Sequence, residues 1–390
     1  MAERTSPSSM EFKGTGSSHS SPRSEPRDKR LISAAEGDRR LREELSKLLT
    51  DRREAGLEGL VGGLEAVVIN TEPHLWGLAS EELLRSTGHG FVEAFRDPQS
   101  MTAVLSNEGS SDILVRSRLG GDNPFLRHNL HPKSGHLPNT RLETLVFRTK
   151  DIEELIPIQR SRGVSFLSED MIEGDNCAFI QTVPSKYTGN SIGFIERGGG
   201  APDYRTPDSE PLEFDLAKPD LGHLSKITYL DHAATRVRAE DRVAAMKEFL
   251  SLTNYCFDFA IYVRELNSIT SVARFEGSKF AMVFTSGISP YVSEEISGPT
   301  EKFVHNYGAR VHHLAFQTEE IEETCSSLIG DGIEFLIALV GSPEEGLKQT
   351  FTQPSPHTLI VNEYIHRYGD FDGFFTKSNV TLLTKATGNQ

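Results

Sequence analysis

Residues 351–367 of the chain read FTQPSPHTLIVNEYIHR, and residues 181–197 read QTVPSKYTGNSIGFIER. The two stretches align without a gap, and Pro, Ser, Thr, Ile and Arg stand at the same offsets in both. Two further pairs of stretches match at almost the same spacing: 140–155 with 309–324, and 162–167 with 331–336. A shared spacing across three pairs indicates an internal repeat, which constrains the fold more strongly than local propensity does.

Each copy of the repeat predicts the same order of elements. An alternating strand is followed by Thr and acidic residues that suit the first turn of a helix, then by a helix, a Gly turn and further strands. A similar unit comes earlier in each half and begins with the strands predicted over residues 226–237 and, more weakly, 62–71. Each half therefore holds two βαβββ modules, and the chain is predicted to be an α+β protein of two similar domains.

Composition changes along the chain give the domain boundaries. The first residues are rich in Ser, Pro, Arg and Gly and poor in large apolar residues, so they cannot offset the entropy cost of ordering. Their acidic residues argue against an organelle transit peptide. Leucines spaced along one face predict an amphipathic helix over 34–54. We predict a disordered tail over 1–33, a first domain over 34–200, a Gly- and Pro-rich linker over 201–222 and a second domain over 223–390.

Charge and cysteine content restrict the partners and the compartment. The formal net charge of -15 disfavours binding to phosphate backbones and anionic membranes, so no nucleic-acid or membrane partner is expected. Cys177, Cys256 and Cys325 show no metal-binding spacing, which favours a reduced, cytoplasmic location. No apolar run reaches the roughly 18 residues that a membrane-spanning helix needs. The sequence leaves the oligomeric state open, although a homo-oligomer is possible.

The positions at which the copies differ separate the needs of the fold from those of a site. Three potential ligands of the second half align with small or uncharged residues of the first. His313 aligns with Thr144, Glu363 with Gly193, and His232 with a small apolar residue for which Ala66 is the best match. Two imidazoles and one carboxylate form the set that binds non-haem Fe(II) and leaves positions open for substrate and dioxygen. The same set suits Zn(II), Ni(II) or Mn(II), so the pattern predicts a metal site more firmly than it predicts the metal.

Each of these residues also has a structural interpretation. A single His in a strand is more often a hydrogen-bonded core residue than a ligand. His312 and His313 are adjacent, so strand alternation sends them to opposite faces, and the flanking residues do not decide which one faces the interior. Glu363 could be a charge at a strand edge, but its apolar neighbours make burial of a free carboxylate costly, and a metal ion would remove that cost.

The second half resembles the catalytic domain of 4-hydroxyphenylpyruvate dioxygenases, which belong to the vicinal oxygen chelate superfamily. The resemblance covers about residues 226–380 and is carried by four motifs: YLDHAAT (229–235), FVHNYGARVHHLAFQTEEI (303–321), LKQTFTQPSPHTLIVNEYIHR (347–367) and GFFTKSN (373–379). It implies glyoxalase-like half-barrels closed by a C-terminal lid helix. It also implies His232, His313 and Glu363 as iron ligands, which selects His313 over His312.

The resemblance further implies an activity and residues that contact the substrate. An enzyme of this type uses O2 to decarboxylate and hydroxylate an aromatic α-keto acid, by default 4-hydroxyphenylpyruvate to homogentisate in tyrosine catabolism. Gln349 matches a glutamine that lines the family's substrate pocket, Phe374 matches the phenylalanine of the lid, and Asn379 matches an asparagine of the lid.

Some pocket positions depart from the family. Arg264 stands where the family has Ser, and Thr285 or Ser286 stands where the family has Asn. The segment between 336 and 347 is shorter than in typical members, and GFFTKSN has an extra residue and one glycine fewer. The alternatives are an enzyme like 4-hydroxymandelate synthase, an oxygenase with another substrate, a metal- or ligand-binding protein without turnover, and a Zn or Ni isomerase or lyase.

Overall fold

The computed structural model describes residues 27–174, 176–199 and 203–390. The chain divides into two compact units, residues 1–44 and 45–390, and helix α1 (Arg27–Glu54) crosses the boundary between them. The helix begins at Arg27 rather than at Ala34. The rest of the predicted tail, residues 1–26, lies outside the described residues. In the described part of the chain, no helix is long and apolar enough to cross a membrane.

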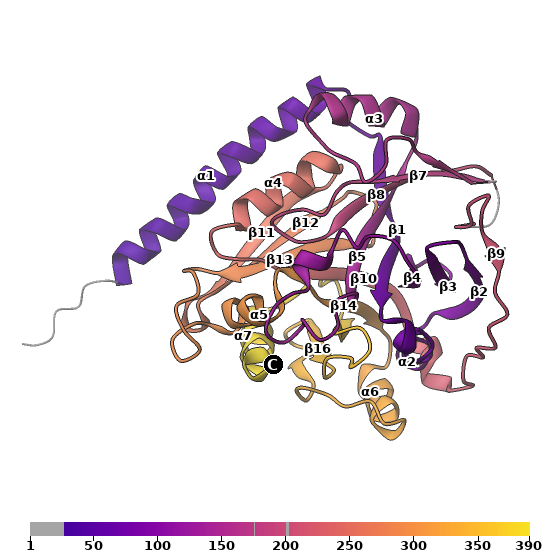
Figure 1. Ribbon diagram of the computed structural model, residues 1–390. Coiled ribbons are helices and arrows are strands. Elements are labelled where there is room, and N and C mark those ends of the chain that lie inside the picture. The colour runs from indigo at the N-terminus through magenta and orange to yellow at the C-terminus, as the bar shows by residue number, and fades with distance from the viewer. Residues whose placement is uncertain (1–26, 175, 200–202) are drawn as a thin grey trace, which may run out of the picture. The chain divides into compact units, whose positions relative to one another are not determined.

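The first half of the larger unit forms a nine-stranded sheet. The strands lie in the order β6 (Ile172–Glu173), β7 (Cys177–Gln181), β8 (Ser191–Arg197), β5 (Arg141–Thr149), β1 (Val61–Thr71), β4 (Asp112–Arg118), β3 (Ser100–Ser106), β2 (Gly90–Arg96) and β9 (Glu210–Pro211). The helices of this half are η1 (Pro73–Leu75), α2 (Trp76–Ser86), η2 (Leu126–His128) and α3 (Ile152–Ser161). The sheet curls into a half-barrel (Figure 1).

The second half repeats this arrangement with an eight-stranded sheet. The strands lie in the order β11 (Cys256–Val263), β12 (Ser268–Arg274), β13 (Ala281–Gly287), β10 (Ile227–Arg236), β14 (Arg310–Thr318), β17 (Val361–Arg367), β16 (Leu347–Phe351) and β15 (Val340–Ser342). Its helices are η3 (Gly222–Lys226), α4 (Arg242–Leu252), η4 (Arg264–Leu266), α5 (Pro299–Tyr307), α6 (Ile321–Gly330), α7 (Lys377–Ala386) and η5 (Thr387–Asn389). The predicted α+β fold of two domains with two βαβββ modules each is confirmed.

Strand pairing superimposes the two halves residue by residue. Val146 in β5 pairs with Ala66 on one side and with Gly193 on the other. Its counterpart in β14 pairs with His232 on one side and with Glu363 on the other. The alignment of the copies is therefore confirmed, including the less certain match of His232 with Ala66.

The equivalent helices α3 and α6 begin differently in the two copies. In the first copy the Asp151 side chain accepts a hydrogen bond of 2.8 Å from the backbone N–H of Glu154, as expected of a helix N-cap. In the second copy Glu320 is the N-cap but has a φ of 47° and makes no capping bond with its side chain. Its carboxylate pairs instead with Lys226, 2.5 Å away. The helix that was predicted from an acidic first turn is present in both copies.

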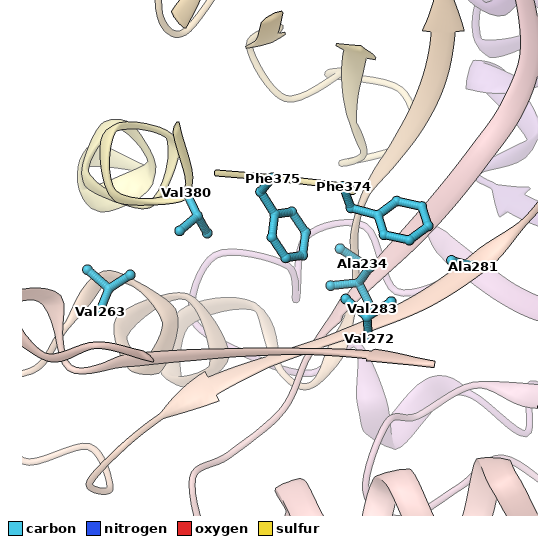
Figure 2. Close-up of a cluster of buried hydrophobic side chains, with 8 residues drawn as sticks. All are labelled: Ala234, Val263, Val272, Ala281, Val283, Phe374, Phe375 and Val380. Atoms are coloured by element: carbon cyan, nitrogen blue, oxygen red, sulfur yellow. The ribbon is translucent and has the colours of Figure 1, made fainter. Parts of the chain in front are cut away.

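Helix α7 closes the second half-barrel, as the predicted C-terminal lid helix would. It contacts β11 near one edge of the sheet and β15 and β16 at the other. The loop before it brings Phe374 and Phe375 into the interior, where both side chains are buried. Figure 2 shows both rings on the side of the sheet that carries Ala234, Val272 and Val283. This part of the half-barrel interior, called the chamber below, is thus filled by packed apolar side chains that include both aromatic rings.

Candidate metal centre

His232, His313 and Glu363 meet inside the second half-barrel. Their nearest ligand atoms all lie within 4.8 Å of one another, and no other such group of His, Cys, Asp or Glu occurs in the part of the chain that is described. The Nε2 atoms of both histidines are 3.2 Å from Oε2 of Glu363. All three side chains are buried, so the cluster is a site within the core and not a surface ion pair.

The sheet accounts for the meeting of these side chains. They come from the neighbouring strands β10, β14 and β17, with β14 in the middle. His232 and Glu363 pair with the same residue of β14, Ala315, and His313 lies two positions before it on the same face. In the first sheet the same three positions hold Ala, Thr and Gly, so that half-barrel offers no ligand there.

The structure distinguishes the two adjacent histidines. His313 points Nε2 at Glu363, whereas His312 directs its Nε2 at Oε1 of Gln390, 2.8 Å away. Their Nδ1 atoms are 2.8 Å apart, so one of these atoms must accept the proton of the other. Burial lowers the pKa of both rings, and the buried Arg236 adds to this effect. Both are therefore neutral imidazoles, which is the form that binds a metal.

His232 is held by a carboxylate and an arginine. Its Nδ1 lies 2.8 Å from Oδ1 of Asp231, and the Arg367 guanidinium donates to both oxygens of that carboxylate at 2.6 and 3.0 Å. Burial would lower the pKa of His232, but Glu363 and Asp231 together raise it to about 9. A carboxylate behind a ligating imidazole fixes the orientation and tautomer of the ring.

Glu363 is a carboxylate in an interior that would otherwise exclude it. Burial would raise its pKa, but His232 and His313 lower it to about 2, so it is ionised. The side-chain amide of Gln349 donates to its Oε1 at 2.6 Å. Within the described chain, the buried Nε2 of His232 has no well-aligned hydrogen-bond partner. Two imidazole nitrogens and one carboxylate oxygen that converge in this way fit a first-row divalent metal ion.

The predicted substrate residues lie beside the cluster. Gln349 also donates to the carbonyl oxygen of Phe374 at 2.7 Å, and the Asn379 amide donates to Oε1 of Gln349 at 3.1 Å. The ring of Phe374 meets the ring of His232 edge to face, with centroids 5.4 Å apart. The chain thus links the lid to the cluster through one glutamine.

The pair of Asp231 and Arg367 was missed by comparing the two copies. The first half has the same pair, in which Arg197 donates to Oε1 of Glu65 at 2.9 Å. Because both halves of the chain contain this ion pair, the differences between the copies give no sign that it has a role in the site. In the second half, however, the residue after the carboxylate is His232, so a structural ion pair also orients a candidate ligand.

Residues that depart from the family pattern divide into two groups. Arg264 lies in η4 and is exposed. Thr285 and Ser286 lie in β13, and Thr285 is level with Arg236 of β10. Of the departures noted in the sequence, those in β13 therefore lie in the wall of the half-barrel that holds the cluster.

Comparison with known proteins identifies the fold. No family model matches the sequence, and no curated protein matches it. Among solved structures, a triple mutant of 4-hydroxymandelate synthase from Streptomyces coelicolor superimposes with a TM-score of 0.62 at 16% identity, over 84% of this chain and 98% of that one. The chain has the fold of 4-hydroxymandelate synthase.

A second solved structure agrees. It is a fusion protein of a xylose isomerase-like TIM barrel and a 4-hydroxyphenylpyruvate dioxygenase, with a TM-score of 0.59 and 14% identity. The match covers 85% of this chain and 53% of the fusion protein, so this chain corresponds to about half of it. The resemblance predicted from the sequence is confirmed at the level of the fold.

Proposed function

We propose that the chain is an Fe(II)-dependent dioxygenase that decarboxylates and hydroxylates an aromatic α-keto acid, with His232, His313 and Glu363 as the iron ligands. The observation that carries this proposal is the buried cluster, in which one ionised carboxylate faces two imidazole nitrogens at 3.2 Å. The fold supports it as well, because the two solved structures of similar fold are named as a 4-hydroxymandelate synthase and a fusion protein that contains a 4-hydroxyphenylpyruvate dioxygenase.

Held by these three residues, Fe(II) would supply open coordination positions that the carboxylate and keto oxygens of the substrate could chelate, with a further position for dioxygen. The surrounding residues hold these ligands in place. Asp231 and Arg367 orient His232, and Gln349 orients Glu363. Nδ1 of His313 lies 2.8 Å from Nδ1 of His312, whose Nε2 lies 2.8 Å from Oε1 of Gln390. With a metal ion on Nε2 of His313, its Nδ1–H would donate to His312, and the Nε2–H of His312 would donate to Gln390. Each ligand thus has a partner that fixes its direction.

The chamber suits an aromatic substrate. Its walls are Val263, Val272 and Val283 together with two alanines, and they face Phe374 and Phe375. These rings close the chamber, so a keto acid can reach the cluster only after the loop before α7 moves. Once the loop returns, Phe374 shields the reacting carbon from water and packs against the aromatic ring of the substrate.

For the substrate we propose 4-hydroxyphenylpyruvate, with homogentisate as the product, in tyrosine catabolism within the cytoplasm. The apolar walls support the aromatic ring of this substrate. Thr285 or Ser286 stands where the family has an asparagine near its substrate, and Thr285 is the one that pairs with Arg236 of β10. The hydroxyl side chain here is smaller than that of asparagine and leaves more room beside the substrate. Phenylpyruvates with other ring substituents should therefore be included in the same test.

The experiment is oxygen uptake on a panel of aryl-pyruvates. Protein loaded anaerobically with Fe(II) and ascorbate is mixed with 4-hydroxyphenylpyruvate or phenylpyruvate, and O2 and CO2 are measured together. Phenylacetate, which lacks the keto group, is the control. Equal O2 consumption and CO2 release support the proposal, and chromatography then separates homogentisate from 4-hydroxymandelate, the product of benzylic hydroxylation. Metal binding without oxygen uptake favours a binding protein, and tight Zn or Ni without iron favours an isomerase or lyase.

A further inference from the structure

The first half-barrel, which lacks the metal ligands, contains a cavity of about 160 Å³. A wider cavity of about 680 Å³ adjoins it, since both are lined by the same five residues: Asp97, Ser100, Arg116, Ile172 and Thr206. None of these residues takes part in the candidate metal centre. The first half-barrel is therefore not simply a filled structural copy of the second.

The inner cavity is lined mainly by apolar side chains, with Asp97, Thr102 and Arg205 among the polar ones, and its volume suits one aromatic ring. It is lined by a buried cluster and by aromatic side chains packed against that cluster: Val68, Phe95, Leu114, Val146, Ile195, Phe179 and Tyr204. An engineered apolar cavity of about 150 Å³ is large enough to bind benzene. The inner cavity can accept a ring of that size without rearrangement of the sheet.

Strand register places this cavity where the chamber of the second half-barrel lies. Val68 pairs with Leu114 in the first sheet, and their counterparts Ala234 and Val283 pair in the second. In the second half-barrel the rings of the lid fill the space over these residues. In the first half-barrel Tyr204, from the segment after β8, lies against the cluster and leaves part of the space open.

No metal can be held there in the same way. Gly193 replaces the carboxylate, and a Cβ atom at this position would lie 2.8 Å from Cε2 of Phe179. Phe179 itself stands at the position of Gln349, as the pairing of β7 with β8 and of β16 with β17 shows. In the first half-barrel, Gly193 therefore stands in place of the carboxylate ligand and Phe179 in place of the glutamine. A cavity with this lining suits an organic molecule.

Arg116 supplies a polar group at the junction of the two cavities. It occupies the position that Thr285 has in the second sheet. Its Nη2 lies 3.0 Å from Oε2 of Glu143, but the same buried carboxylate also binds Arg118 at 2.5 and 2.7 Å. Two guanidinium groups therefore share one carboxylate. Among the described residues, the buried Nε of Arg116 has no hydrogen-bond partner.

Asp97 also lines both cavities, and among the described residues it forms no ion pair with Arg116. Its oxygens accept hydrogen bonds from the backbone N–H groups of Gln99 and Ser100 and from the hydroxyl of Ser100, all within one turn. Arg205, which also lines the inner cavity, lies 3.3 Å from Asp203 and 3.5 Å from Glu93. Arg116, whose side chain is 23% exposed and shares the single charge of Glu143 with Arg118, thus adds positive charge where the two cavities meet.

We propose that the first half-barrel binds a small aromatic carboxylate without a metal ion. The ring occupies the inner cavity, and the carboxylate lies at the junction with the outer cavity, where it accepts a hydrogen bond from Arg116. This site is separate from the proposed oxygenase site, and the proposal does not depend on turnover in the second half-barrel.

The test measures binding of phenylacetate and of its neutral analogue phenylacetamide to the full chain by ligand-observed NMR. Arg116→Gln should lower the affinity for phenylacetate at least about tenfold, because a hydrogen bond to a charged group contributes that much binding free energy. It should leave the affinity for phenylacetamide unchanged. Arg96→Gln is the matched control, since it removes an exposed arginine that, within the described part of the chain, forms an ion pair only with Glu210, at 3.1 Å.

Two further variants locate the site. Val68→Phe fills the inner cavity and should abolish binding of both probes, whereas His232→Ala alters the second half-barrel and should change neither. If His232→Ala removes the binding while Arg116→Gln leaves it intact, the probe binds in the other half-barrel and the proposal is wrong. Equal affinity for both probes, or no binding of either, also overturns it. If Val68→Phe does not fold, the comparison of the two probes in Arg116→Gln still decides.

Discussion

Asp231→Asn should weaken metal binding and the fold together, for separable reasons. The substitution keeps the shape of the side chain but removes the charge that faces Nδ1 of His232 at 2.8 Å and Arg367 at 2.6 and 3.0 Å. Loss of a partner behind a ligating histidine lowers metal affinity about 10- to 100-fold. Breaking a buried ion pair costs about 3–5 kcal/mol of unfolding free energy.

The first half of the chain offers a matched control for this variant. Glu65 holds the position of Asp231 and accepts from Arg197 at 2.9 Å, but the next residue is Ala66 and not a histidine. Glu65→Gln should therefore destabilise the protein to urea by a similar amount. Its affinity for Fe(II) or Co(II) should equal that of the wild type, since no ligand depends on Glu65.

The assay pairs urea unfolding of the metal-free proteins with competitive metal titration. The reasoning predicts that the two variants have similar unfolding free energies and that only Asp231→Asn loses metal affinity. If both variants bind metal as the wild type does, Asp231 does not orient His232. If both lose affinity equally, the effect is a general consequence of instability, and the assignment of Asp231 to the site is wrong.

Three other changes test separate parts of the account. Phe374→Ala should cost about 3–5 kcal/mol of stability and speed the release of bound metal to a chelator, because the ring over His232 is lost; unchanged release would show that Phe374 does not close the site. Gly193→Ala should cost about 1–3 kcal/mol, because its Cβ would lie 2.8 Å from Phe179, and a neutral effect in thermal unfolding would contradict the packing described. Burial lowers the pKa of His89 to about 4 from 6.5, so the stability that its neutral ring supplies is present above pH 6.5 and is lost as pH falls toward 4. His89→Leu should flatten the stability profile in that window by about 3 kcal/mol, and an unchanged slope would mean that His89 does not titrate this way.

The repeat made most of the fold predictable from the sequence. A shared offset aligned two modules in each half, and strand pairing then reproduced that alignment down to Ala66 and His232. The choice between His312 and His313 could not come from alternation alone, because each position would bury one ring. It required the direction in which each ring points.

Two features could not be predicted from the sequence: the role of the Asp231–Arg367 pair in the site and the cavity beside Arg116. Asp231 and Arg367 have equivalents in the first half, so their second role depends on one neighbouring histidine. Arg116 corresponds to Thr285 only through strand register, and the cavity beside it depends on Tyr204, which reaches the cluster from outside the repeated strands. A cavity is the space that packed side chains leave empty, and its volume cannot be predicted from the order of residues in the sequence.

The most direct test of the central claim is the ratio of CO2 released to O2 consumed by the iron-loaded chain with an aryl-pyruvate, measured alongside Glu363→Gln. The account predicts equal amounts of the two gases from the wild type. It predicts neither gas exchange nor bound iron in the variant, whose fold should remain intact. Iron bound equally by both proteins, or no oxygen uptake by the wild type on any aryl-pyruvate, would contradict it.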